Sequence, residues 1–171
     1  MNLAWWENGF RHTTNSRRPI TKLEDFNGVK MRVMQNNIFL DTFRTLGSNA
    51  VPMAFSEVYQ ALQTGVVDGT ENPISNFYTQ KMHEVQKYMT ITDHGYLGYA
   101  VIVNKKFWDG LPADIRTQLE TALVEATDYA NTIAMDMNKK DLESVKASGK
   151  TAVTTLTPEE RAAFKTAMVP V

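Results

Sequence analysis

The chain has 171 residues, of which 43% are hydrophobic and 22% charged, with a formal net charge of −1 and no cysteine. This composition is typical of a globular protein that buries a sizeable core, and the missing cysteine excludes disulfides, thiolate nucleophiles and cysteine-ligated zinc. The near-neutral charge, without a basic stripe, argues against nucleic acid as a partner. No apolar run reaches the length that spans a bilayer, and no signal-peptide pattern opens the chain.

The first third of the sequence predicts alternating strands and short helices. Alternation at Leu3 and Trp5 indicates a strand that runs into a loop at Gly9, and the polar stretch after it is typical of a connector. Period-2 alternation and helical spacing then predict further elements. In order, we expect a strand over 3–11, a connector over 13–22, a helical turn over 23–26, a strand over 29–34, a helix over 38–46 that stops at Gly47, and a strand over 50–53.

A capped helix and a polar turn are predicted within the stretch VPMAFSEVYQALQTGVVDGTENP. Ser56 is a favoured N-cap for a helix over 57–64, with Gly65 as its terminator. The two valines at 66–67 predict a short buried strand, and the Asp-Gly step after them predicts that DGTENP is a turn. The proline that closes the stretch suits the first turn of a helix over 74–80.

The second half predicts two strands, one unusually long helix and a last short one. β-Branched residues with little charge predict strands over 88–92 and 99–104. No breaker interrupts 112–148, where apolar residues recur at three- and four-residue steps, so we expect one amphipathic helix that spans more than one lobe. Thr157-Pro-Glu-Glu160 is a capping box for a final helix to Met168. This alternation predicts an α/β fold with a largely parallel sheet.

Arg32 is the most informative candidate for a binding residue, because it lies between Met31 and Val33 in a predicted strand. A guanidinium cannot be neutralised, so its burial requires a fixed anion beside it. The neighbouring segments offer no obvious carboxylate for that role. We therefore predict that Arg32 awaits a carboxylate ligand. The alternative is an ordinary edge-strand residue.

Three further residues have both a functional and a plain interpretation. Arg11 is either a second ligand-binding cation or, as the residue alone favours, a surface residue beside a loop. Phe55 is either core or an apolar wall against the carbon skeleton of a ligand. Asn72 either starts the following helix as a cap or offers its amide to a carboxylate or hydroxyl.

Metal and catalytic chemistry have little support in the sequence. The histidines at 12, 83 and 94 show no metal-binding spacing, and we expect neither a metal nor a cofactor. No serine-hydrolase, P-loop or dinucleotide motif is present. The acids Asp68, Glu71 and Asp93 are interpreted as solvated or capping rather than catalytic, so no residue is predicted to be catalytic.

Five stretches together resemble the extracytoplasmic solute-binding proteins of tripartite ATP-independent periplasmic (TRAP) transporters, the DctP-type family. They are WENGFRHTTNSRRPI, GVKMRV, VPMAFSEVYQALQTGVVDGTENP, KMHEVQKYMTITDH and VNKKFWDGLP. The resemblance covers essentially the whole chain, residues 1–171. It implies a periplasmic-binding-protein-like (type II) α/β fold with two lobes that close on a ligand, here incomplete, and a long helix that bridges the lobes.

The resemblance also implies roles for individual residues. Arg32 matches the arginine that pairs with the substrate carboxylate through a two-pronged salt bridge, and Asn72 matches the asparagine that contacts the same carboxylate. Some relatives bind through a metal, with an acid and a tryptophan where this chain has Glu71 and Asn72, so the asparagine favours the metal-free mode. The implied ligand-binding residues are Arg32, Asn72, Arg11, Phe55, Glu71 and His94.

The implied function is capture of a small carboxylate, a C4-dicarboxylate or a sugar acid, in the periplasm for delivery to a TRAP membrane permease, without enzymatic activity. We expect the chain to lack a signal peptide and an N-terminal α/β portion, because both ends look cut, and we expect the apolar surface so uncovered to favour self-association. The alternatives are an enzyme that acts on an organic acid with His94 or Glu71 as base, and an effector-sensing domain of similar fold.

Overall fold

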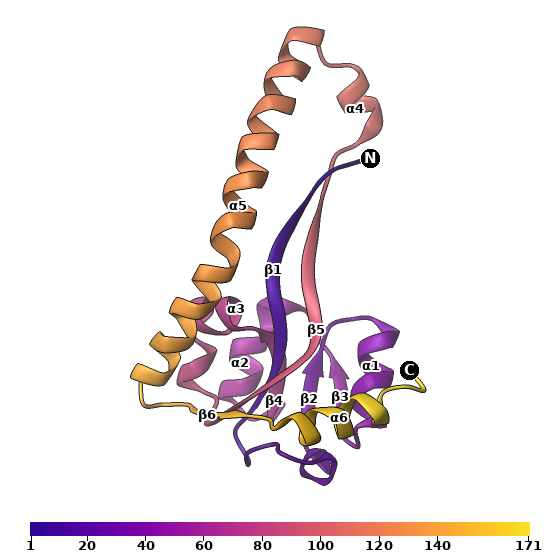
Figure 1. Cartoon of the computed structure of the whole chain (residues 1–171). Coiled ribbons are helices and arrows are strands. Elements are labelled where there is room, and N and C mark those ends of the chain that lie inside the picture. Colours follow the sequence, from indigo (N-terminus) through magenta and orange to yellow (C-terminus); the bar gives the residue numbers. More distant parts are fainter.

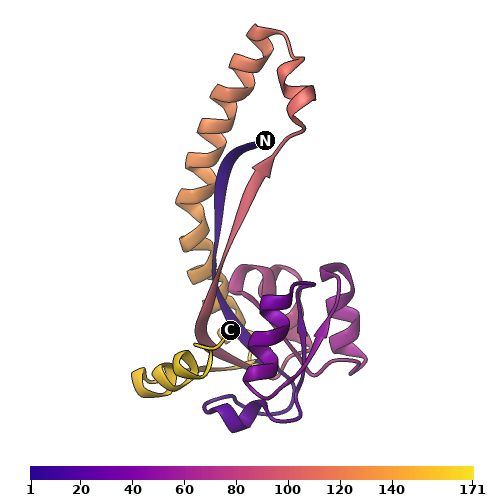
Figure 2. The same ribbon diagram turned by 90° about the vertical axis from the view of Figure 1, so that its right-hand side faces the viewer.

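The computed structural model describes residues 1–171 as a mixed α/β lobe from which a long arm projects (Figure 1). We define the arm as residues 1–10 and 95–130 and the lobe as the rest. Two strands and one helix run continuously from the lobe into the arm, and Figure 2 shows the arm standing clear of the lobe in the perpendicular view. The elements in chain order are β1 (Asn2–Asn15), η1 (Leu23–Phe26), β2 (Lys30–Val33), α1 (Asn37–Thr45), β3 (Asn49–Pro52), η2 (Phe55–Glu57), α2 (Val58–Gln63), β4 (Gly69–Pro73), α3 (Ile74–Thr79), η3 (Met82–Glu84), β5 (Tyr88–Ile102), α4 (Lys105–Asp109), α5 (Ala113–Ala147), β6 (Ala152–Thr155) and α6 (Pro158–Ala167).

One six-stranded sheet connects all the strands, in the order β3-β2-β4-β1-β5-β6. The pairs β2–β3, β2–β4 and β5–β6 are parallel, whereas β1 is antiparallel to both β4 and β5. The sheet is therefore mixed, and the prediction of a largely parallel sheet holds only for the pairs that do not involve β1. The reason is that β1 and β5 form one long ribbon, whose pairing direction local sequence patterns do not reveal.

Two hydrophobic clusters flank the sheet. Met31 and Val33 of β2 belong to the first cluster, where Phe43 of α1 and Phe164 of α6 cover them. The second cluster is built by α2, α3 and the C-terminal end of α5. Because side chains alternate along a strand, Arg32 projects to the face opposite Met31 and Val33.

The helices largely follow their local signals. α1 ends at its predicted stop, where Gly47 has a φ of +93°, and α5 covers the predicted long helix with 35 residues. Both halves of the capping box of α6 form, with Thr157 and Glu160 bonded to each other's backbone N–H groups. No helix in the structure is long and apolar enough to cross a membrane.

Ser56 is not the N-cap of a helix, contrary to the prediction. A 3₁₀ turn over Phe55–Glu57 leads into α2, and Ser56 lies inside it; neither Ala54 before the turn nor Glu57 before α2 makes a capping side-chain bond. The helix therefore begins later than expected, at Val58. The turn places the ring of Phe55 near Arg32.

The strand boundaries needed four further corrections. β1 continues through Gly9 and Thr13 to Asn15, and β5 is one strand where two were expected. The reason is that β1 and β5 pair with each other through the segments that were predicted to be loops. Val66 is exposed and belongs to no strand. The supposed turn DGTENP contains β4, a central and completely buried strand.

Gly69 explains why a turn signal occurs at the start of a buried strand. A Cβ atom on Gly69 would collide with the carbonyl oxygen of Thr14 and lie 2.8 Å from the sulfur of Met31. The glycine is therefore required by the close approach of β1 and β2 rather than by a turn.

Candidate functional site

A cavity of about 530 Å³ opens where β2, β3 and β4 end. Ligands of α/β proteins commonly bind at the carboxyl ends of parallel strands. The lining contains two arginines, several amides and a phenol, but no carboxylate. Its residues are Arg11, Arg32, Met34, Gln35, Asn36, Met53, Ala54, Phe55, Asn72, Asn76, Leu97 and Tyr99.

Arg32 faces this cavity with part of its guanidinium unpartnered. The residue is 2% exposed, and its Nε and Nη2 both donate to the carbonyl oxygen of Met53, at 3.0 and 2.7 Å. Its Nη1 is buried and has no hydrogen-bond partner. Arg32 forms no ion pair within the chain, as the sequence predicted, and burial accordingly lowers its pKa although Glu71 acts in the opposite direction.

Phe55 is 41% exposed and lies beside Arg32, with its ring centroid 5.8 Å from the guanidinium carbon. The aromatic face favours the cation and leaves the remaining N–H groups free. Phe55 is thus neither core nor isolated, but part of the cavity wall. It can present an apolar surface to the carbon skeleton of a ligand.

Asn72 is 4% exposed and lines the cavity from β4. Its side chain makes one long hydrogen bond within the chain, from Nδ2 to Oγ1 of Thr70 at 3.4 Å. Since Asn72 pairs with His12 in the sheet, it does not serve as a helix cap. Its amide can donate to an incoming oxygen.

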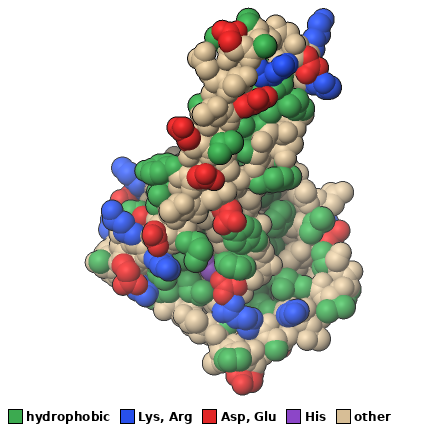
Figure 3. All heavy atoms as spheres, turned by 45° about the horizontal axis from the view of Figure 1, so that its top comes forward, with side chains coloured by type: hydrophobic (Ala, Val, Ile, Leu, Met, Phe, Trp, Pro, Cys, Tyr) green, Lys and Arg blue, Asp and Glu red, His purple; other side chains and the backbone are tan.

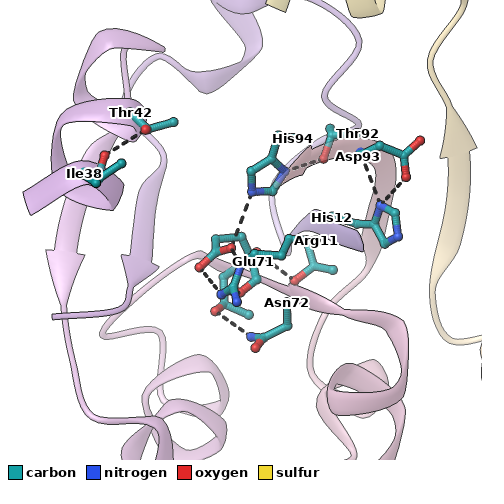
Figure 4. Close-up of polar contacts among 11 residues, drawn as sticks. Arg11, His12, Ile38, Thr42, Glu71, Asn72, Thr92, Asp93 and His94 are labelled. Atoms are coloured by element: carbon teal, nitrogen blue, oxygen red, sulfur yellow. Dashed lines mark hydrogen bonds and ion pairs between the residues drawn. The ribbon is translucent and has the colours of Figure 1, made fainter. Parts of the chain in front are cut away.

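Arg11 is buried, 1% exposed, and bound to Glu71, which is completely buried. Its Nε and Nη2 donate to the two carboxylate oxygens of Glu71, the second bond measuring 2.6 Å, and Nη2 also reaches the carbonyl oxygen of Glu71 at 3.2 Å (Figure 4). The interpretation of Arg11 as a surface residue was wrong, because the strand continues through it and the carboxylate of β4 compensates its charge.

His94 approaches the same carboxylate from β5. Its Nε2 lies 3.4 Å from Oε2 of Glu71, and its Nδ1 is 2.7 Å from Oγ1 of Thr92 (Figure 4). The imidazole also packs edge-on against Phe43, with centroids 5.5 Å apart. Three elements thus converge on one buried carboxylate.

The environment of Glu71 keeps it ionised. Burial alone would raise the pKa of the carboxyl group, but the contact with His94 and the hydrogen bonds and charge of Arg11 outweigh burial and lower it. Because Arg11 is neutralised in this way, the only uncompensated charge at the cavity belongs to Arg32.

The six residues predicted for the site therefore divide into two groups. The cavity is lined by four of them, Arg11, Arg32, Phe55 and Asn72. The other two do not line it: Glu71 pairs with Arg11, and His94 contacts Glu71.

Sequence reasoning missed several lining residues. Asn76 and Tyr99 are joined through the Nδ2 of Asn8, which donates to both at 3.0 and 2.8 Å. Asn36 caps α1 by accepting from the backbone N–H of Ile38 at 2.8 Å, and an asparagine directly before a predicted helix was the sequence signal that could have marked it. Nothing local marks Tyr99, which reaches the cavity only through the long β5.

The other acids have structural partners. Asp68 accepts the backbone N–H of Lys30 at 2.9 Å, and Asp93 pairs with Arg161 of α6. No group of three or more acidic or histidine side chains is arranged to hold a metal ion.

The model of the family described as bacterial extracellular solute-binding protein, family 7 (DctP), matches residues 1–171. The chain belongs to this family. The C4-dicarboxylate-binding periplasmic protein DctP of Rhodobacter capsulatus is 57% identical over 169 residues, which are 99% of this chain and 50% of that protein. The chain spans about half the length of the curated relatives it matches.

Solved structures of DctP-like proteins superpose closely on the chain. A TRAP periplasmic solute-binding protein from Shewanella oneidensis with bound succinate has a TM-score of 0.96 at 36% identity, covering 99% of this chain and 55% of that one. The sugar acid binding protein DctPAm from Advenella mimigardefordensis, in complex with galactonate, has a TM-score of 0.95 at 38% identity, with the same 99% and 55% coverage. The predicted fold class is thereby confirmed, and the chain corresponds to a little over half of that fold.

Proposed function

We propose that the chain forms the carboxylate-binding part of an extracytoplasmic solute-binding protein of a TRAP transporter. It would capture a small organic acid, a C4-dicarboxylate or a sugar acid, and pass it unchanged to a membrane permease. The observation that carries this proposal is the buried, unpartnered Nη1 of Arg32 in a cavity without a carboxylate.

The physical argument starts from the charge of Arg32. A buried cation without a counterion is unfavourable, and an incoming carboxylate removes this penalty. Charge-assisted bonds to two guanidinium nitrogens fix the plane of the carboxylate as well as its position. In this proposal Asn72 donates to the same group and Phe55 covers the adjacent carbon atoms, which is supported by the presence of both residues in the cavity lining.

The rest of the lining suits the remainder of such a ligand. Asn36, Asn76 and Tyr99 offer donors and acceptors for hydroxyl or carboxylate oxygens. Relatives of the family have been solved with succinate, L-malate, galactonate and glucuronate. These bound ligands include C4-dicarboxylates and sugar acids, so they support both of the proposed ligand classes.

An enzymatic role has less support from the geometry. Glu71 and His94, the residues considered as bases, do not line the cavity, and the carboxylate of Glu71 is bound to Arg11. A binding protein returns its ligand unchanged, so incubating each acid with the protein and analysing the solution for products separates the two functions.

The test is a thermal-shift and calorimetric screen of the complete gene product against C4-dicarboxylates, hexuronates, aldonates, sialic acid and 2-oxo acids. We expect saturable stabilisation by at least one carboxylate, and none by the corresponding amide. Stabilisation by the neutral amide as strong as by the acid would contradict the proposal.

A further inference from the structure

The β1–β5 ribbon contains a large bulge beside the site. Arg11 pairs with Gly95 and Thr13 pairs with Thr90. Four residues of β5, Ile91–His94, therefore lie opposite the single residue His12 of β1. Such bulges reorient side chains and bend a ribbon, and this one lies where the ribbon leaves the lobe (Figure 1).

Asp93 is the conformationally unusual residue of this bulge, with a φ of +46°. Left-handed backbone is unfavourable for residues other than glycine and persists where its surroundings fix it. Here the backbone N–H of Asp93 donates to Nδ1 of His12 at 3.4 Å. The Asp93 carboxylate pairs with the guanidinium of Arg161, which comes from α6.

Asp93 and His94 are neighbours in β5, but their side chains contact different groups of residues. Figure 4 shows His94 turned toward Glu71 and Arg11, while Asp93 is turned toward His12. The backbone of Asp93 thus determines where the ring of His94 lies. The side chain of Asp93 is held from the side of α6, away from the cavity.

We propose that Arg161 is a positioning residue for the ligand site, because its ion pair with Asp93 holds the bulge that sets His94 against Glu71. The consequence for ligand affinity rests on the proposed function. The consequence for His94 does not depend on any ligand.

The anchoring of α6 makes Arg161 suitable for this role. Phe164, one turn further along, is 4% exposed and packs edge-on against Phe26 in the first hydrophobic cluster. The helix therefore stays docked when the charge of Arg161 is removed. Releasing Asp93 frees the bulge, and His94 then loses its fixed position beside a carboxylate that also holds Arg11.

The primary test replaces Arg161 by glutamine in this chain and records the imidazole ¹⁵N signals of His94 by NMR. We expect these signals to shift or broaden in Arg161→Gln and to return in Arg161→Lys, which keeps the charge. Lys165→Gln is the matched control, because it removes a charge from an exposed position of the same helix that forms no ion pair. It should leave the His94 signals unchanged.

A second variant makes the result independent of damage to α6. Asp93→Asn removes the carboxylate but keeps a residue type that tolerates left-handed backbone. It should reproduce the change seen in Arg161→Gln, and the double variant should not exceed Asp93→Asn alone, since Arg161→Gln removes only the ion pair that Asp93→Asn already removes, whereas Asp93→Asn also alters the 3.6 Å contact of the carboxylate with His12. Unaltered His94 signals in both single variants would overturn the inference.

Affinity measurements extend the test to the ligand. In the complete gene product, Arg161→Gln should weaken binding of the preferred carboxylate about tenfold, a typical coupling between contacting groups, while Lys165→Gln should not. Shifted His94 signals with unchanged affinity would overturn the part of the inference that concerns the ligand. If no form of the protein binds any carboxylate, the proposed function fails, and the His94 signals still decide the positioning role.

Discussion

Two buried arginines border the same cavity and differ in how their charge is compensated. Arg11 has a carboxylate of its own chain, Glu71, at ion-pair distance. Arg32 has only the carbonyl oxygen of Met53 and the ring of Phe55. A carbonyl and an aromatic ring stabilise a cation partially, whereas an anion neutralises it. At the scale of single residues, this difference is the reason we propose Arg32 as the ligand-binding group and Arg11 as a supporting one.

The first prediction concerns the geometry of Arg32. Replacing it with alanine in the complete gene product should weaken carboxylate binding by about 3–5 kcal/mol, or roughly two to four orders of magnitude. Arg32→Lys should recover little of this, because an ammonium group is a point charge without the planar fork. Isothermal titration calorimetry measures both variants. Near-normal affinity in Arg32→Lys would rule out two-pronged binding.

The second prediction concerns the pH dependence of stability and follows from His12, which is 4% exposed. Burial lowers its pKa from 6.5 to about 4, although Asp93 acts in the opposite direction while His94 and Arg161 add to the lowering. As the pH falls below 6.5, the unfolded chain therefore takes up the proton before the folded one. Stability is complete above that pH and declines until about pH 4.

Between pH 7 and pH 5, His12 should thus reduce the free energy of unfolding by about 2 kcal/mol. His12→Asn keeps an acceptor for the backbone N–H of Asp93 and should show a correspondingly smaller decline. Urea denaturation of both forms at the two pH values measures the difference. Equal declines in the parent and the variant would contradict a neutral, buried His12.

At the scale of elements, two asparagine side chains of α5 form hydrogen bonds with backbone groups along one edge of β1. The amide of Asn131 accepts from the N–H of Glu7 at 2.8 Å and donates to the carbonyl of Trp5 at 3.2 Å. Asn138 donates to the carbonyl of Asn8 at 2.7 Å and accepts from the N–H of Ser75 at 3.0 Å. The helix thus satisfies backbone groups that another strand would otherwise pair.

The third prediction compares these two asparagines. Asn138→Ala should destabilise the chain by about 2 kcal/mol and Asn131→Ala by about 1, because the bonds of Asn138 are more buried and a buried unpaired backbone group is costlier. The higher helix propensity of alanine offsets roughly 0.5 kcal/mol in each case. Chemical denaturation gives the values. Gln118→Ala, on the exposed surface of the same helix, is the control and should be neutral.

At the scale of the whole molecule, the arm exposes an unusual amount of hydrophobic surface. Trp5, Ile102, Phe107 and Tyr129 are 66, 75, 60 and 68% exposed, and Figure 3 shows hydrophobic side chains along the projecting part. A cavity of about 470 Å³ between the start of β1 and α5 adds to this surface. Exposed apolar side chains gathered on one part of a protein are typical of interaction sites.

The fourth prediction is therefore that the 171-residue chain self-associates through its arm. Sedimentation velocity should show concentration-dependent species for the chain, and Ile102→Lys should shift them toward the monomer. Val66→Lys is the matched control, since Val66 is 58% exposed but lies on the lobe. A parent chain that stays monomeric at all concentrations would refute the prediction.

Local sequence signals predicted those elements whose cause lies within a few residues. The stop of α1 at Gly47, the long periodicity of α5 and the capping box of α6 each depend on neighbours along the chain. The unpaired state of Arg32 also followed from the sequence, because an arginine between apolar strand residues near no carboxylate is recognisable locally. For Asn72 and Phe55 the sequence left a functional and a plain interpretation open, and the family resemblance favoured the functional one.

Only the tertiary structure decided which polar residues are buried and with what partner. Arg11 and Glu71 are 60 positions apart, so no residue close to Arg11 in the sequence indicates its counterion. DGTENP has the composition of a turn, yet it is a central strand because β1 and β2 pair with it on both sides. Turn and strand propensities differ by about 1 kcal/mol or less per residue, whereas pairing along two edges and burial of an ion pair act over the whole segment. Long-range contacts therefore outweigh the local preference where the site is built.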